Sequence, residues 1–254
     1  MSKKLSVHVP QKQLPKNDHE RGSYIAGLID AQGHLNDQGQ YIISFDSRDV
    51  SHAYKVKSWI GYGSVRQIKE KNQLILVIHG KKAFERLWFL LNGKLRVQDR
   101  IQEWNFRIRE MYKLPYDLMP SSFPIDWNSY WFPGFFSGYG RFVLEIFGKD
   151  EIRLKIKVHQ CTRILLDEIC KRFGGRVLER QDTYVFDSVS FQNFKEVLVF
   201  FDKHHLQSPL HYLLYRLMRK AAILIESKQA NTHQGFAKIQ SLQKVIGPLA
   251  RKTK

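Results

Sequence analysis

Few side chains in this sequence have both the type and the spacing for chemistry. Asp30 is a lone acid inside an apolar, glycine-containing stretch, and the pair His204 and His205 could be read as metal ligands or as an acid–base pair. Adjacent residues at a helix end point in different directions, so packing or RNA contact is the favoured role for these histidines. Cys161 and Cys170 have neither a zinc-site spacing nor a disulfide framework, and we expect a reducing compartment.

Two stretches rich in small residues resemble each other. Residues 24–33 read YIAGLIDAQG, and residues 131–140 read WFPGFFSGYG. The small residues are Ala26, Gly27 and Ala31 in the first stretch and Gly134, Ser137 and Gly138 in the second. Such residues predict two helices whose backbones approach closely. The final Gly33 and Gly140 suit a helix end that turns at once into a strand.

Each of these stretches opens the same order of predicted elements, α-β-β-α-β-β-α. Period-two alternation predicts the strands and a period of 3.6 predicts the helices. In the first half the elements are a hairpin over 34–46, a helix over 49–61, a hairpin over 64–80 that turns at Lys71 and Asn72, and helical stretches over 81–92 and 97–111. In the second half they are strands over 141–148 and 152–160, a helix over 162–175, a hairpin over 176–190, and helices over 191–203 and 208–228. A last helix over 234–247 stands outside the repeat.

This repeat predicts the domain organisation. The predicted segments are a basic N-terminal arm over 1–22, a first repeat over 23–111, a proline-containing linker over 112–127, a second repeat over 128–228, and a C-terminal helix and basic tail over 229–254. Ser23 is the expected cap of the first motif helix, and Asp126 or Asn128 that of the second.

The charge balance points to a polyanionic partner. The chain has 41 Lys and Arg against 24 Asp and Glu, a net charge of +17. Nucleic acid is favoured over an acidic membrane surface, because no apolar run approaches the length of a spanning helix. The N-terminus lacks the apolar centre of a secretory signal.

The paired motifs resemble those of the LAGLIDADG homing endonuclease and intron maturase family, in its single-chain, two-repeat form common in organellar introns. The likeness spans about residues 20–245 and includes the segments IGYGSV, LNGKLR, FGGRV and YRLMRKAAILIESK. It implies a mixed α+β fold with pseudo-twofold symmetry, in which two motif helices pack along the central axis and two antiparallel four-stranded sheets form a saddle. It also implies a monomer that is an internal pseudo-dimer.

The resemblance further implies a metal site that this sequence has lost. In the family, the acid just before each motif's last glycine binds a divalent ion that activates water. The matching residues here are Gln32 and Tyr139. A neutral amide and a protonated phenol are poor ligands for Mg²⁺, so we predict no metal, no cofactor and no catalytic residue. Asp30 lies about 200° around the helix from the ligand position and should not replace it.

Two other departures from the family pattern, and one residue that resembles it, concern the positions around the lost metal site. The lysine that the family often places after the GKL-like segments is absent in either register of Leu95 and Leu206. Gln160 resembles a polar residue near the family's metals and can persist from ancestry. Pro133 stands inside the second motif helix and is expected to kink it.

Rows of polar side chains are the candidate nucleic-acid contacts. Gln67, Lys69 and Lys71 would share one strand face in the first half, and Arg153, Lys155, Lys157 and His159 one in the second. A solvated sheet face is the alternative, but acids are expected to be few on these faces. The further candidates are Lys94, Arg96, Arg216, Arg219 and Lys220.

Three functions fit these observations. The favoured one is a non-cutting protein that binds structured RNA in a mitochondrion, with the chloroplast as alternative, either as a maturase for intron RNA or as a ribosome component beside ribosomal proteins. The other two are a DNA-binding protein without cleavage and an active DNA endonuclease. RNA is preferred over DNA because two basic arms suit an irregular RNA surface.

Overall fold

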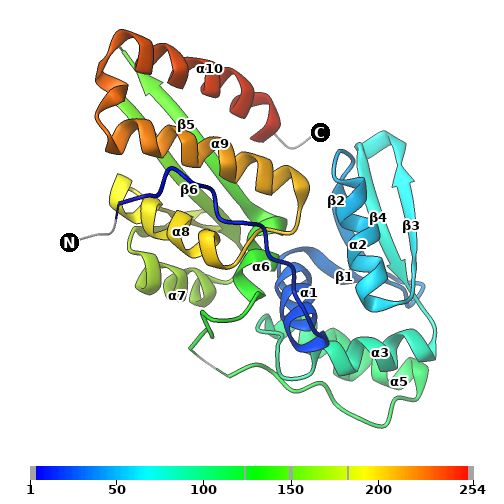
Figure 1. Ribbon diagram of the computed structural model, residues 1–254. Coiled ribbons are helices and arrows are strands. Elements are labelled where there is room, and N and C mark those ends of the chain that lie inside the picture. Colours follow the sequence, from blue (N-terminus) through cyan, green and yellow to red (C-terminus); the bar gives the residue numbers. More distant parts are fainter. Residues whose placement is uncertain (1–3, 123, 149–150, 182, 251–254) are drawn as a thin grey trace. The chain divides into compact units, whose positions relative to one another are not determined.

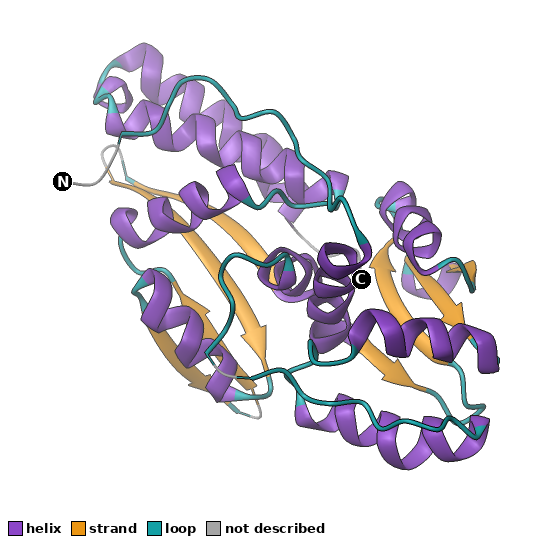
Figure 2. Ribbon diagram, turned by 60° about the horizontal axis from the view of Figure 1, so that its bottom comes forward, coloured by secondary structure: helices purple, strands orange, loops and turns teal. Residues whose placement is uncertain are grey.

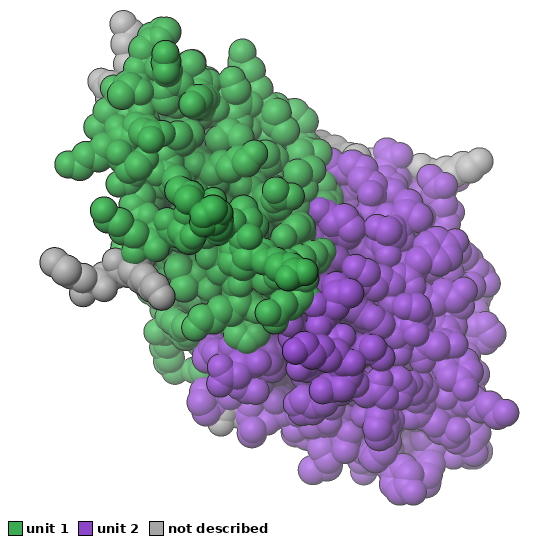
Figure 3. Space-filling model, in the orientation of Figure 1, with its two compact units in different colours: residues 1–13, 140–205, 210–252 green, residues 14–139, 206–209, 253–254 purple. Residues whose placement is uncertain are grey.

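The structure is a computed structural model that describes residues 4–122, 124–148, 151–181 and 183–250, except the side chain of Lys69. It consists of two compact units (Figure 3). Of the described residues, unit 1 holds 4–13, 140–205 and 210–250, and unit 2 holds 14–139 and 206–209. Both motif helices belong to unit 2, so the units follow packing and differ from the sequence repeats.

Unit 2 contains the first repeat and the second motif helix (Figure 1). Its elements are α1 (Asp18–Gln32), β1 (Gly33–Leu35), β2 (Tyr41–Asp46), α2 (Val50–Ile60), β3 (Ser64–Ile68), the 3-10 turn η1 (Lys69–Lys71), β4 (Gln73–Ile78), α3 (Lys81–Leu91), α4 (Gln98–Gln102), the π-helical segment η2 (Glu103–Ile108), α5 (Arg109–Tyr112) and α6 (Trp131–Tyr139). The predicted helix over 97–111 is thus one helix interrupted by a π-helical segment.

The first motif helix begins earlier than the sequence predicted. Asn17 is its N-cap, and the Asn17 side chain accepts a hydrogen bond from the backbone N–H of Glu20 at 2.9 Å. Ser23 is not a cap, because its hydroxyl donates to the carbonyl of His19 one turn earlier. The acids Asp18 and Glu20 in the first turn suit the positive end of the helix. Residues 18–22 therefore extend the helix and do not form part of an arm.

The two motif helices touch backbone to backbone at two glycines. A methyl group on Gly27 would overlap the carbonyl oxygen of Trp131, and one on Gly134 would overlap the carbonyl oxygen of Tyr24. This reciprocal contact explains why small residues are needed in both stretches. All residues of α1 from Gly22 to Ala31 are buried, so the pair forms the centre of unit 2.

Pro133 costs α6 no hydrogen bond, contrary to the expected kink. It is the third residue of the helix, where the backbone N–H groups have no partner within the helix. The backbone N–H of Trp131, the first residue of α6, donates a hydrogen bond to the hydroxyl of Ser129 at 3.4 Å. The helix begins at Trp131, and the acceptor for its first N–H is Ser129 and not Asp126 or Asn128.

The first sheet is antiparallel with strand order β1-β2-β4-β3. Its helix-covered face includes Phe45, whose ring lies 5.1 Å from that of His52 on α2. Ser44, Ile75 and Arg66 are cross-strand partners on the opposite face. Alternation along each strand therefore separates a core face from an open face.

Unit 1 repeats the same arrangement after the second motif. Its elements are β5 (Gly140–Phe147), β6 (Glu151–Gln160), α7 (Arg163–Phe173), β7 (Arg176–Arg180), β8 (Thr183–Asp187), α8 (Phe191–Lys203), α9 (Pro209–Glu226), the 3-10 turn η3 (Gln229–Asn231) and α10 (His233–Ala250). The second sheet has the order β5-β6-β8-β7, which corresponds strand for strand to the first. The predicted pair of four-stranded antiparallel sheets in a mixed α+β fold is confirmed.

The N-terminal segment is packed against unit 1. Leu5 is buried, and its N–H donates to the carboxylate of Glu226 at 2.8 Å. The ammonium of Lys12 lies 4.4 Å from the centre of the Tyr212 ring. Residues 4–13 of the predicted flexible arm therefore form an ordered N-terminal strap along α9 (Figure 1). None of the described helices is long and apolar enough to cross a bilayer.

The glycine contact can be tested by adding a single methyl group. Gly134→Ala should lower the free energy of unfolding by about 1–3 kcal/mol or more, because the new methyl group has no room beside Tyr24. Urea denaturation would measure the loss. Gly247→Ala is the matched control, since no atom lies within 4 Å of the added group and alanine favours the helix. Equal stability of both variants would refute the close-contact explanation.

Candidate nucleic-acid interface

The ends of the two motif helices meet in unit 2. A methyl group on Gly138 would press on the side chain of Ala31 and would lie 3.4 Å from Cδ of Gln32. Gln32 uses its amide N–H to hydrogen-bond the carbonyl of Ser44 on β2. Tyr139, the last residue of α6, is half-buried. The positions that match the family's acids therefore hold a neutral amide engaged with a strand and a phenol.

Asp30 is fixed as a structural acceptor. Its carboxylate accepts hydrogen bonds from the backbone N–H groups of Arg96 and Val97, each at 3.0 Å. It also accepts one from the indole N–H of Trp131 at 2.8 Å. Burial raises the pKa of Asp30 to about 6, although the hydrogen bonds from Val97, Trp131 and Arg96 act in the opposite direction. The carboxylate connects α1 to α6 and to the segment before α4.

These residues do not fit the divalent metal that the family's acids hold. Mg²⁺ requires charged oxygen ligands, and neither Gln32 nor Tyr139 supplies one. The oxygens of Asp30 are already occupied by three N–H donors. Within the part of the chain that the structure describes, no group of three or more His, Cys, Asp or Glu could hold a metal ion. Gln32 and Asp30 are thus engaged in hydrogen bonds that pack α1 against its neighbours.

A buried network of polar side chains connects the two motif helices to α2. The Tyr24 hydroxyl lies 2.7 Å from Nε2 of His52 and donates to the Ser137 hydroxyl at 3.0 Å, and Nδ1 of His52 lies 3.1 Å from the Asp49 carboxylate. Ser137 in turn donates to the carbonyl of Pro133. The network connects α1, α2 and α6. This network could not be predicted from the sequence, because its residues are distant along the chain and no spacing pattern relates them.

The second sheet presents the predicted basic row on its open face. Phe142 faces the helices, with its ring 6.4 Å from that of Phe201 on α8, so the alternate residues of β5 and β6 face away. Burial alternates along β6 accordingly, with Leu154, Ile156 and Val158 buried. The open face carries Arg141, Arg153, Lys155, Lys157, His159, Arg176 and Arg180. The four residues predicted on β6 thus do share one face.

Three of these cations come from neighbouring strands that the sequence analysis did not include. Arg141 pairs with Lys157, Lys157 pairs with Asp187, and Asp187 pairs with Arg176, so one row crosses all four strands. The alternation in RFVLEIFG could have placed Arg141, which is exposed, on this face. The cross-strand pairing of these residues, by contrast, cannot be predicted from the alternation within a single strand.

Acids on this face are more frequent than expected. Lys155 forms an ion pair with Glu145 at 3.2 Å, and Nε of Arg153 donates to Glu151 at 2.6 Å. Among the residues that the structure describes, Arg141 and Lys157 have no acid at ion-pair distance. These two side chains are the strongest candidates for phosphate contacts.

The row predicted on the first sheet does not form. Strand β3 ends at Ile68, and Lys69 and Lys71 lie in η1, because the chain already turns toward Asn72 with a φ of 43°. The side chain of Lys69 lies outside the described residues. Gln67 is exposed but pairs with Leu74 on the helix-covered side of the sheet. Arg66, which pairs with Ile75, occupies the open face instead.

Two candidates near the first motif are engaged locally. The guanidinium of Arg96 donates to the carbonyl of Ser122 at 2.8 Å and lies 5.3 Å from the Trp131 ring centre. Lys94 is half-buried, and burial lowers the pKa of its ammonium. Arg96 therefore packs against α6, and its side chain is not displayed for a phosphate.

The three cations predicted as nucleic-acid contacts on α9 differ in their exposure to solvent. Arg216 and Lys220 are exposed, whereas Arg219 is 1% exposed and pairs with Asp202 through Nε at 3.0 Å. The prediction of a nucleic-acid contact at Arg219 is wrong, because that side chain joins α9 to α8. The Tyr215 hydroxyl donates to the same carboxylate.

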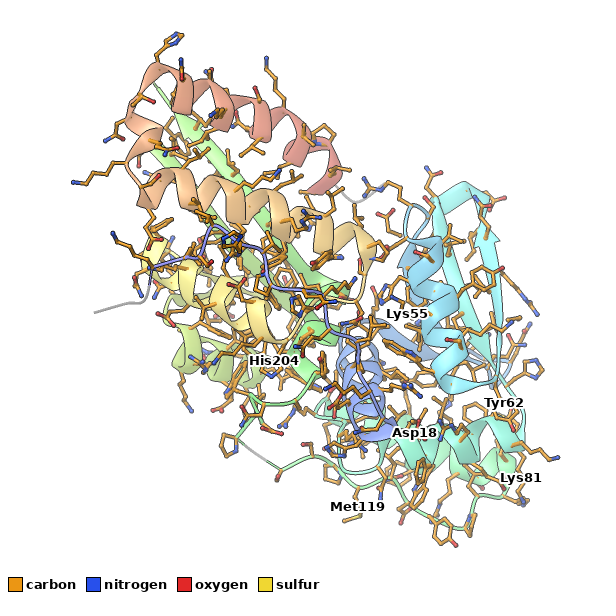
Figure 4. All side chains as sticks on the ribbon, viewed as in Figure 1. Asp18, Lys55, Tyr62, Lys81, Met119 and His204 are labelled. Atoms are coloured by element: carbon orange, nitrogen blue, oxygen red, sulfur yellow. The ribbon has the colours of Figure 1, made fainter. Side chains whose placement is uncertain are left out.

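The remaining polar candidates also pack locally. His204 directly follows α8 (Figure 4). Its ring stacks on that of Phe200, with 4.6 Å between the ring centres, and His205 is buried, with Nδ1 accepting from the N–H of Gln13 at 3.4 Å. The packing role preferred for this pair agrees with these contacts. Gln160 is buried and accepts a hydrogen bond from the N–H of Cys161.

Known proteins share this architecture. The sequence matches no protein-family profile. It is 35% identical over 251 residues to the uncharacterised cox1 intron-2 37.2 kDa protein of Schizosaccharomyces pombe, covering 94% of this chain and 76% of that protein. The structure resembles the LAGLIDADG homing endonuclease I-LtrWI bound to target DNA, with a TM-score of 0.71, 17% identity, and coverage of 89% of this chain and 97% of that one. It resembles I-GzeII in complex with its DNA target with a TM-score of 0.70, 18% identity, and coverage of 88% and 97%.

Paired glycine-contact helices, each leading into a four-stranded antiparallel sheet, define a two-repeat protein of the homing endonuclease type. The chain belongs to the LAGLIDADG homing endonuclease and intron maturase family. The resemblance inferred from the motifs is thereby confirmed.

The buried Asp30 predicts a pH dependence of stability. Its pKa in the folded protein, about 6, lies above the ordinary value of 3.8, so the folded state binds the proton more tightly. This contribution is fully present below pH 3.8 and is lost as the pH rises through about 6. The whole effect is about 2–3 kcal/mol. Urea unfolding between pH 4 and 7 should show this fall in the wild type and not in Asp30→Asn, and parallel curves would contradict the assignment.

The open face of the second sheet predicts a salt-dependent contact with nucleic acid. Arg141→Ala and Lys157→Ala should each reduce the slope of log affinity against log salt by about one unit, because each loses one phosphate contact. Titrations at several salt concentrations would measure this slope. Lys171→Ala is the control, since that side chain is 74% exposed on α7. An unchanged slope in both variants would exclude this face.

Proposed function

We propose that this protein binds structured intron RNA in a mitochondrion and does not cut nucleic acid. Membership in the LAGLIDADG family, with the net charge of +17, indicates a nucleic-acid-binding protein. The observation that carries the absence of cutting is the occupation of both motif ends by Gln32 and Tyr139.

The contacts around Gln32 support the loss of cleavage independently of the side-chain types at the ligand positions. The amide of Gln32 is held by the Ser44 carbonyl, and the neighbouring acid Asp30 is enclosed by N–H donors. A metal would have to displace packed groups at the end of α1. Binding needs none of these groups, because phosphates are contacted by cations on the sheet.

The relative favours RNA of an intron over other RNA. That protein is named for intron 2 of cox1, a gene context that suggests a mitochondrion, and the match covers 76% of its length. The basic row on the second sheet is also more extensive than the cations on the open face of the first, where Arg66 stands beside Ser44 and Ile75. One strongly basic sheet suits an irregular RNA surface better than an evenly spaced duplex. A ribosomal role remains the alternative within RNA binding.

DNA binding without cleavage is the second candidate function. It is favoured by I-LtrWI and I-GzeII, each of which was solved with target DNA and shares this fold. The two candidates differ in the nucleic acid recovered with the protein. Ultraviolet crosslinking in the native host followed by sequencing should recover mainly the intron that encodes the chain. Recovery of genomic DNA would favour the second candidate, and ribosomal RNA the ribosomal role.

Cleavage is tested directly with supercoiled DNA. The purified protein should neither cut nor nick a plasmid that carries its insertion site with Mg²⁺ or Mn²⁺ present. The single change Gln32→Asp should add little activity, because Tyr139 still occupies the second ligand position. Double-strand cuts by the wild type, or activity restored by this single change, would contradict the proposed function.

A further inference from the structure

Unit 1 contains an apolar groove between its last two helices. The groove has a volume of about 910 Å³ and is formed by α9, α10 and the N-terminal strap. Its apolar lining residues are Val7, Ile223, Leu224, Ala237, Leu242 and Val245. Helices α9 and α10 run side by side in both ribbon views (Figures 1 and 2). This surface is separate from the basic face of the second sheet.

Helix α10 has more apolar surface than its own unit covers. Ile239 and Ile246, two turns apart, are buried as α10 packs beside β5. A second row along the helix lines the groove at a spacing of three and four residues, in which Ala237, Leu242 and Val245 are apolar and Gln234, Lys238 and Ser241 are polar. Val245 in this row is 49% exposed. A continuous second row at helical spacing is the surface that another helix would cover.

The charges around the groove are of one sign. Lys220 of α9 and Lys238 of α10 line it, while α9 and α10 together contain a single acid, Glu226. That acid is held by Lys195 and by the N–H of Leu5, and is not available to balance the rim. An occupant with acidic flanks would complement this surface.

We propose that this groove binds an amphipathic α-helix of a partner protein, with an apolar stripe on one face and Glu or Asp along its flanks. Such a helix would lie between α9 and α10 and add a third helix to this layer, in the helix-in-groove mode. The groove follows α10 from His233 to Val245, a rise of about 18 Å, so about three turns of a partner helix can be accommodated.

Two other polyanions fit the groove less well. Among the described residues that line the groove there is no Phe, Tyr or Trp on which bases could stack. A lipid surface binds a protruding apolar helix face, whereas here the apolar side chains line a hollow between two helices. The combination of a concave apolar floor and a cationic rim thus favours a folded acidic helix.

The test uses two labelled synthetic peptides of 15 residues with identical leucine stripes at helical spacing. The remaining positions are Glu in one peptide and Lys in the other, and fluorescence anisotropy measures binding to the full-length protein. The Glu peptide should bind saturably and at least tenfold more tightly than the Lys peptide. Val245→Asp should weaken it at least tenfold, while Leu213→Asp, at a 45% exposed position of α9 outside the groove, should not.

Charge reversal separates binding from folding. The double variant Lys220→Glu and Lys238→Glu changes exposed side chains only, and should reverse the preference in favour of the Lys peptide. Equal binding of both peptides, no saturable binding, or insensitivity to Val245→Asp would overturn the proposal. Binding of anionic vesicles or of single-stranded RNA that is lost in Val245→Asp would also overturn it, in favour of a lipid or RNA surface.

Discussion

The close contact between the backbones of α1 and α6 is the constraint on which unit 2 depends. Gly27 and Gly134 meet the opposite main chain so closely that neither tolerates a methyl group. Once the helices are this close, the residues around them must be buried and satisfied. Asp30 and Tyr24 fulfil this requirement through hydrogen bonds that also fix α2 and the segment before α4.

Under the proposed function, the requirement for packing allows the fold to persist without the metal-binding acids. In the family the same helices position metal-binding acids, but the glycine contact does not need those acids. At the ends of the helices, Gln32 contacts β2 and Gly138 contacts Ala31, so the neutral residues are part of the packing. The sheets that follow each helix remain in place, and the second sheet displays its cations independently of the helix ends.

Much of the fold could be predicted from sequence, because its signals are local. Alternation along residues 152–160 placed Lys155 and Lys157 on one face, and the small residues of the motifs predicted the helix contact. Signals that depend on distant partners were missed. Arg219 reads as an exposed cation until Asp202 is brought beside it, and Lys71 reads as a strand residue until the turn at Asn72 ends β3 early. Sequence spacing describes an element well and describes its neighbours poorly.

The central claim is that the ends of the motif helices hold no divalent metal. Electron paramagnetic resonance titration with Mn²⁺ measures this directly, because bound ions lose the signal of free Mn²⁺. The wild type should leave Mn²⁺ free at concentrations where a variant carrying both Gln32→Asp and Tyr139→Asp takes it up. Uptake by the wild type as tight as that of the double variant would contradict the account.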